Sequence, residues 1–148
     1  MRHEDQVNLL YLIKELELAV RSRLDAVVGA AGLTTIQYTA LTVLRAHPDM
    51  TSAALARRSF VRAQTMAELV ATLEDRRLIE RRPDPTSKRQ NLIRLTSEGT
   101  RVLDELREPV ARIEHQMTAG TAESRIASTR KVLGAWRDGL TASTDVNT

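Results

Sequence analysis

The 148-residue sequence contains no cysteine, which excludes disulfide scaffolds, thiolate zinc sites, iron–sulfur clusters and thiol-based redox sensing. It also lacks an apolar run of about 18 residues, so we expect no transmembrane helix and no membrane partner. Its charged N-terminal stretch has no signal-peptide hydrophobic region, and a cytoplasmic protein is therefore expected. Because 42% of the residues are hydrophobic and 28% are charged, the chain can bury the core of one folded domain.

Aromatic residues and histidines are also scarce. One Trp, two Tyr and one Phe are too few for the stacked platforms that single-stranded nucleic acids need. The three histidines, His3, His47 and His115, lie far apart in a chain without cysteine, so we expect no metal site. The sequence has no glycine-rich phosphate loop, no nucleophile elbow and no paired acid cluster. We therefore expect neither an enzyme nor a bound cofactor.

Positive charge is concentrated in the middle of the chain. Residues 51–101 hold eleven Lys or Arg against six Asp or Glu, whereas the rest of the chain is mildly acidic. A basic middle between acidic ends suggests a surface that binds a polyanion. A solvated charged surface is the alternative that charge alone leaves open.

Hydrophobic periodicity predicts six helices and one β-hairpin. The first helix, over 4–31, is apolar on more than one face and ends at Gly29 and Gly32. A helix of this kind needs two partners, and in a small protein the second is often another subunit. Three helices follow: one that a Thr34–Gln37 capping box starts and His47–Asp49 ends, a short one capped by Thr51 or Ser52, and one over 63–76. Strands over 78–82 and 91–95, joined by a loop over 83–90, form the hairpin. The last elements are a helix over 97–118 that Pro109 kinks without ending, a helix capped by Thr121, and a disordered tail from Thr141 or Ala142.

This order of elements is that of a winged helix–turn–helix within a mainly α (α+β) fold. We expect residues 33–96 to form the DNA-binding domain, 1–32 with 97–141 to form a helical dimerisation region, and 142–148 to be a disordered tail. The helix over 63–76 would enter the major groove, and the hairpin would be the wing. This helix has a small, polar outer face, on which Gln64 can pair with both N6 and N7 of adenine.

In these features the sequence resembles the MarR family of bacterial transcriptional regulators (multiple antibiotic resistance regulator). The resemblance is strong over about 33–101 and extends to the flanking helices by their order and length. The residues that carry it are Leu33–Leu41, Leu55-Ala56, Gln64-Thr65-Met66, Leu69-Val70, Leu73-Glu74, Leu78–Arg81, Asp84-Pro85, Lys88-Arg89 and Leu95–Gly99.

The resemblance implies a homodimer that binds a pseudo-palindromic operator, usually as a repressor. It also implies release by a small, often aromatic or phenolic, ligand between the dimerisation and DNA-binding parts. Three positions depart from the family pattern, and the first is Ala67, which stands where a threonine often follows the recognition segment. Ser87 replaces an aspartate that usually orients the wing arginine, so Arg89 is less rigidly held. Arg77 replaces a glycine, so it either adopts a positive φ, at a cost of about 1 kcal/mol, or the helix ends by another route.

Two sets of residues are candidates for binding. Lys88 in the wing could instead point away from DNA, and Glu68 could be a solvated residue paired with Arg62 or Thr72. Among the effector candidates, Tyr11 and Tyr38 could instead pack in the core. The expected DNA-binding residues are Arg62, Ala63, Gln64, Thr65, Glu68, Lys88 and Arg89, and the effector candidates are Tyr11, Arg21, Tyr38 and His47.

The leading hypothesis is a ligand-responsive regulator that binds double-stranded DNA in a sequence-specific manner. The family resemblance implies that this regulator is a repressor. The alternative is a winged helix used as a protein-interaction module or as a nonspecific architectural DNA-binding module. Binding to DNA upstream of its own gene, with unrelated DNA as competitor, separates the two.

Overall fold

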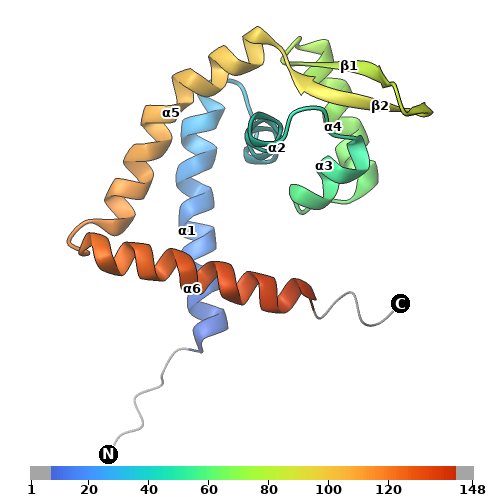
Figure 1. The fold of residues 1–148 in the computed structure, drawn as a ribbon. Helices are drawn as coiled ribbons and strands as arrows, with labels where there is room; N and C mark the ends of the chain where they lie inside the picture. The colour runs from blue at the N-terminus through green and yellow to red at the C-terminus, as the bar shows by residue number, and fades with distance from the viewer. Residues whose placement is uncertain (1–7, 143–148) are drawn as a thin grey trace, which may run out of the picture. The chain divides into compact units, whose positions relative to one another are not determined.

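The computed structural model describes residues 8–142. Their chain order is four helices, a two-stranded hairpin and two more helices, as the sequence predicts (Figure 1). The elements are α1 (Leu9–Gly29), α2 (Thr35–Ala46), α3 (Ser52–Arg58), α4 (Ala63–Asp75), β1 (Ile79–Asp84), β2 (Ser87–Leu95), α5 (Ser97–Thr118) and α6 (Glu123–Ala142).

The chain divides into two compact units, one up to Ile113 and one from Glu114 onward. The first unit contains the core, in which α2, α3 and α4 pack with the hairpin and the end of α1. The second unit contains α6, which has no buried side chain. The largest fully buried side chains of the core are Val28, Leu41, Leu44, Leu55, Met66, Val70, Leu73, Ile79 and Ile93.

Local capping starts two of the helices as predicted. At α2, the Thr34 hydroxyl accepts from the Gln37 backbone N–H at 3.2 Å, and the Gln37 side chain accepts from the Thr34 N–H at 3.0 Å. This is a complete capping box, which satisfies two backbone donors that a helix start leaves unpaired. At α3 the cap is Thr51, whose hydroxyl accepts from Ala54 N–H at 3.2 Å.

Several predicted boundaries were wrong. The helix expected over 4–31 begins at Leu9, after the N-cap residue Asn8, and its last residue is Gly29. The expectation that Gly29 and Gly32 end it is confirmed, because the chain turns at Gly32 with φ 73°. α6 begins at Glu123, preceded by Ala122 instead of the expected cap Thr121, and it continues through Thr141 and Ala142, where the tail was expected to begin. The rest of the expected tail, 143–148, lies outside the described residues, as do 4–7 of the first helix.

The hairpin is longer than predicted. The expected loop over 83–90 is mostly strand, because pairing between β1 and β2 extends from Ile79↔Leu95 through Pro83↔Asn91. Pro83 is tolerated because, within residues 8–142, β1 has only β2 as a neighbouring strand, and the register shifts directly after Pro83. Thr86 closes the turn by donating its backbone N–H and its hydroxyl to the Asp84 carboxylate, at 2.8 and 2.7 Å. The backbone ladder thus overrides the local turn signals except at the tip.

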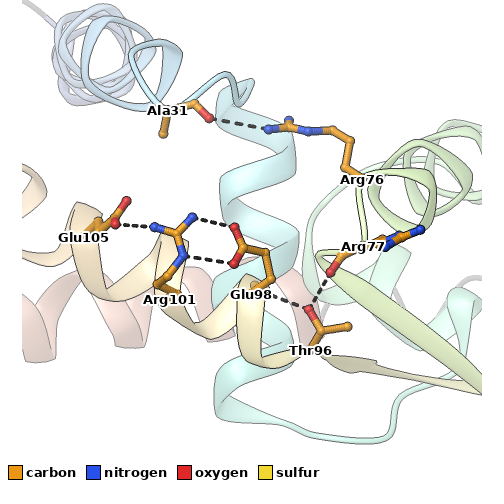
Figure 2. A network of polar contacts seen from close by, with 8 residues as sticks. Ala31, Arg76, Arg77, Thr96, Glu98, Arg101 and Glu105 are labelled. Atoms are coloured by element: carbon orange, nitrogen blue, oxygen red, sulfur yellow. Dashed lines mark hydrogen bonds and ion pairs between the residues drawn. The ribbon is translucent and has the colours of Figure 1, made fainter.

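Two other expectations concern Pro109 and Arg77. The expectation that Pro109 does not end its helix is confirmed, because Pro109 lies inside α5, which continues to Thr118; the kink stays a prediction. Arg77 has φ 59° and ends α4 in a Schellman motif, in which Leu78 N–H donates to Leu73 O at 3.0 Å and Arg77 N–H donates to Glu74 O at 2.8 Å. Thr96 then donates its hydroxyl to Arg77 O at 2.6 Å, which joins the end of α4 to the start of α5 (Figure 2).

Figure 2 also shows how the end of α4 is tied to the α1–α2 connection. The guanidinium of Arg76 donates to Gly32 O at 2.6 Å and to Ala31 O at 3.5 Å. On α5, Arg101 pairs with Glu98 and Glu105, which raises the pKa of the arginine. The contacts of Arg76 and Arg77 thus fix the C-terminal end of α4 against the α1–α2 connection and the start of α5.

Candidate nucleic-acid interface

The turn between α3 and α4 is a second Schellman motif, centred on Phe60. Val61 N–H donates to Ala56 O at 3.1 Å, and Phe60 has φ 58°. The Phe60 side chain is 79% exposed, whereas Val61 packs against the core. Arg62 follows as the N-cap residue of α4 and makes no side-chain capping bond. The turn therefore presents the first residues of α4 to solvent.

Helix α4 has one buried face and one small, polar face. Met66, Leu69, Val70 and Leu73 are buried in the core. Every residue expected to contact DNA from this region is exposed, namely Arg62 at the N-cap and Ala63, Gln64, Thr65 and Glu68 in the helix.

The alternative partners expected for Glu68 are not contacts of its carboxylate. The Thr72 hydroxyl donates to the backbone carbonyl of Glu68 at 3.1 Å. Within residues 8–142, no ion pair joins Glu68 to Arg62. Both charged side chains are therefore exposed without pairing to each other, Arg62 at the N-cap and Glu68 on the helix.

The structure separates the five basic residues of the hairpin into two groups. Arg81 on β1 makes two hydrogen bonds of 3.0 Å to the Glu74 carboxylate, which lowers the pKa of Glu74 and raises that of Arg81. Arg82 and Arg94 both pair with Asp49. Lys88 and Arg89, near the tip, are exposed and form no ion pair with any described residue. Positive charge is thus paired at the base of the hairpin and unpaired near its tip.

Sequence reasoning missed this division. Glu74 and Arg81 are only seven residues apart, but they lie on different elements, and periodicity places no contact between them. Asp49 lies 45 residues from Arg94. The unpaired state of Arg89 agrees with the expectation that Ser87, in place of an aspartate, leaves this arginine less firmly held; Asp84 bonds Thr86 instead. Only the folded chain shows which arginines are free.

The effector candidates do not gather at one place. A surface cavity of about 470 Å³ is lined by α1, α2 and the α3–α4 turn, and of the four candidates only Arg21 lines it. Tyr11 is 57% exposed on α1. Tyr38 packs against the core, and burial raises its pKa. The His47 ring lies 3.2 Å from a guanidinium nitrogen of Arg58.

The cavity combines apolar and polar groups. Ile36, Phe60 and Val61 supply its apolar wall. Arg21 donates to the Glu17 carboxylate, with Nε at 2.7 Å. The Ser59 hydroxyl is buried and has no hydrogen-bond partner among the described residues. A cavity with these walls suits a small molecule that has an apolar body and a polar group.

Other site types find no support in this part of the chain. Among residues 8–142, no cluster of three or more His, Asp or Glu side chains could hold a metal ion. Over the same residues, no helix is both long and apolar enough to cross a membrane.

The chain is similar in sequence to known transcriptional regulators. A family model described as MarR family matches residues 31–90. The transcriptional repressor NicR of Pseudomonas putida is 33% identical over 97 residues, which cover 64% of this chain and 61% of NicR. The transcriptional repressor Rv2887 of Mycobacterium tuberculosis is 32% identical over 108 residues, which cover 73% of this chain and 77% of the repressor.

Solved structures share the fold. The PcaV transcriptional regulator of Streptomyces coelicolor, in complex with its natural ligand, is 27% identical with a TM-score of 0.74, over 93% of this chain and 98% of PcaV. The chain thus matches PcaV over nearly its whole length but spans less than two thirds of NicR.

Proposed function

The chain belongs to the MarR family, and from this premise we propose that it is a transcriptional regulator that binds double-stranded DNA in a sequence-specific manner as a repressor. The observation that carries the proposal is the pattern of unpaired charge. Arg62 at the start of α4 and Lys88 and Arg89 near the wing tip are exposed without ion-pair partners among residues 8–142, while the arginines at the wing base are paired. A winged helix–turn–helix contacts DNA with the start of its recognition helix and with its wing.

Each part of the interface has a role in this proposal. Phosphates or the minor groove would be contacted by Arg62, Lys88 and Arg89. These contacts position the protein on the duplex but do not read the base sequence. Gln64 and Thr65 would reach base edges in the major groove, and the small side chain of Ala63 lets the helix backbone come close. Glu68 could accept from cytosine N4.

The proposed regulator is a homodimer. Apolar side chains are exposed on more than one face of α1, as a helix with a second partner requires. Two copies would place two half-sites about one helical turn of DNA apart, near 10 base pairs centre to centre. We assign residues 1–32 with 97–141 to dimerisation and 33–96 to DNA binding. The exposed apolar side chains of α1 are Leu9, Leu10, Tyr11, Leu12, Ile13, Leu16 and Leu18.

An effector site in the cavity beside the α3–α4 turn completes the proposal. Its walls include Arg21 on α1 and Ser59 and Phe60 in the turn itself, directly before α4. A ligand releases DNA only if it binds the DNA-incompetent conformation more tightly. A molecule in this cavity would touch the turn that sets the position of α4. NicR and Rv2887 are named as repressors and PcaV as a regulator, so the proposal is regulatory rather than catalytic.

A cytoplasmic location is part of the proposal, because the DNA partner of a bacterial regulator lies there. The test of DNA binding is an anisotropy titration with the duplex upstream of the protein's own gene and with a scrambled duplex. Tighter binding to the upstream duplex supports a sequence-specific regulator. Equal binding to both supports an architectural module, and no binding to either supports a protein-interaction module.

The effector proposal has a separate test with three probes of one shape, namely benzoate, benzylammonium and benzyl alcohol. Thermal melting of the wild type and of Ser59→Ala is measured with each probe. A probe that binds the cavity raises the melting temperature of the wild type. We expect Ser59→Ala to weaken that probe by about 0.5–1.5 kcal/mol, the contribution of one hydrogen bond. Failure of all three probes would count against a ligand of this size in the cavity.

A further inference from the structure

Asp49, in the link between α2 and α3, contacts two arginines of the wing. Its carboxylate accepts hydrogen bonds from Arg94, Nε at 3.0 Å and Nη2 at 3.3 Å. One carboxylate oxygen also lies 2.9 Å from Nη2 of Arg82. Since Arg82 is on β1 and Arg94 is on β2, a single carboxylate bridges both strands at the base of the hairpin.

The backbone holds Asp49 in this position. Asp49 has φ 60°, a left-handed conformation that aspartate and asparagine adopt more readily than most residues. The next residue, Met50, exchanges two backbone hydrogen bonds with Ile93 on β2, at 3.2 and 2.7 Å. Met50 and Ile93 are both buried. The side chain of Asp49 therefore points at the two arginines, while the backbone of Met50 is hydrogen-bonded to β2.

A second carboxylate pairs with the hairpin as well. Successive residues of a strand point to opposite faces, so Arg81 and Arg82 leave β1 in opposite directions. Glu74 at the end of α4 pairs with Arg81, and Asp49 pairs with Arg82. Glu74 on α4 and Asp49 in the α2–α3 link thus supply a counterion to each arginine of the wing base, and Lys88 and Arg89 near the tip are left unpaired among the described residues.

We propose that Asp49 is a specificity-determining positioning residue for DNA: it keeps Arg82 and Arg94 paired at the wing base and so confines the wing's free positive charge to the tip. This inference rests on the proposed function. An arginine that is free to reach a phosphate adds affinity for any duplex, whatever its sequence. By occupying two such arginines, Asp49 lowers sequence-independent binding relative to the contacts that α4 makes with bases.

The substitution Asp49→Asn tests the proposal, because asparagine has the same shape and tolerates φ 60°. Affinity is measured against salt concentration on a duplex that the wild type selects from a randomised library, and on its scrambled version. We expect tighter binding to the scrambled duplex and a lower ratio of selected to scrambled affinity. Each arginine that gains a phosphate should add about 0.9 to the salt slope, or about 3.5-fold more loss of affinity between 50 and 200 mM salt.

Asp104→Asn is the matched control. Asp104 on α5 also pairs with two arginines, Arg45 at 2.8 Å and Arg107 at 3.3 Å, and the substitution changes the net charge by the same amount. We expect it to leave the scrambled duplex and the salt slope unchanged. Equal effects of Asp104→Asn and Asp49→Asn would reduce the finding to bulk charge and overturn the proposal.

A double-mutant cycle with Arg82→Gln separates masking of charge from mere support of the fold. We expect Arg82→Gln alone to leave binding to the scrambled duplex unchanged. In the Asp49→Asn background we expect it to reverse the part of the gain that Arg82 contributes, while the part from Arg94 remains. If Arg82→Gln weakens both backgrounds equally, Arg82 already contacts phosphate and the proposal is wrong. It is also wrong if Asp49→Asn weakens both duplexes with an unchanged salt slope. A wild type that selects no duplex would remove the proposed function, and this role with it.

Discussion

A Cβ atom placed on Gly99 would lie 2.1 Å from the carbonyl oxygen of Leu78. The same carbonyl accepts the backbone N–H of Thr96 at 3.1 Å, just before α5 begins. The start of α5 is therefore pressed against the backbone that leads from α4 into the wing. Only glycine permits this approach, because the obstacle is a backbone carbonyl and not the end of a flexible side chain.

We expect Gly99→Ala to lower the free energy of unfolding by about 1–3 kcal/mol, the usual cost of overpacking, as Leu78 or α5 is displaced. Gly29→Ala is the control, since a Cβ there would meet nothing within 4 Å. Urea unfolding of both variants measures the effect. A Gly99→Ala protein as stable as the wild type would show that the junction can relax.

The pair Glu74–Arg81 predicts loss of stability in acid. The arginine holds the pKa of Glu74 below its ordinary value of 4.5. A carboxylate with a lowered folded-state pKa stabilises the fold above its unfolded pKa, and this contribution is lost as the pH falls through the folded pKa. The side chains are partly exposed, so we expect the pair to contribute no more than about 1 kcal/mol.

The measurement is unfolding of the wild type and of Glu74→Gln between neutral pH and pH 3. We expect the two proteins to differ at neutral pH and to converge in acid, because protonated Glu74 resembles glutamine. Other carboxylates, including those of Asp84 and Glu98, also have lowered pKa values, and their protonation in acid destabilises both proteins alike. A difference that grows as the pH falls would contradict the prediction.

The two halves of the α4 start should behave differently on DNA. Arg62→Ala should weaken specific and nonspecific duplexes similarly and reduce the salt slope by about 1 per lost contact. Gln64→Ala should lose about 1–3 kcal/mol per half-site on the operator, with little change on random DNA. Salt titrations of each variant on both duplexes check this. If Gln64→Ala weakens both duplexes equally while Arg62→Ala affects only the operator, the recognition face is assigned wrongly.

Dimerisation predicts that α1 is sensitive to charge. Leu12 and Leu16 are 52% and 46% exposed and lie four residues apart on one stripe of the helix. We expect Leu12→Glu with Leu16→Glu to shift the protein from dimer to monomer, because the carboxylates would be buried without partners. Light scattering at micromolar concentration measures the mass of each protein. The mass of Leu10→Glu, a substitution on another face of α1, is compared with that of the double variant. A wild type that is a folded monomer at this concentration would overturn the homodimer.

The regular elements could be predicted because their signals are local. The capping box of Thr34 and Gln37, the cap at Thr51 and the apolar stripe of α4 act within one or two helical turns. The family resemblance left two alternatives open at Arg77, and the structure has the left-handed one. The expected DNA-contacting residues are exposed, since the face opposite the buried stripe is readable from the period alone.

The hairpin shows where local reasoning failed, and the effector candidates show that residue type does not determine which side chains lie together. Prolines and polar residues indicated a loop over 83–90, yet strand pairing extends through Pro83 because the backbone ladder bonds more groups than the turn would. Tyr38 and His47 were grouped with Arg21 by residue type. The fold instead packs Tyr38 against the core and brings His47 to Arg58.

What the sequence determined by itself is the order and type of the elements and the exposed face of α4, because helix period, caps and turns depend on neighbouring residues. What only the tertiary structure decided is which of the many arginines are free. Asp49 meets Arg94 across 45 positions, and Arg76 meets Gly32 across 44. Such pairs form only when packing of the core brings distant segments together, so charge count predicts a basic surface, but the folded chain determines where that charge can act.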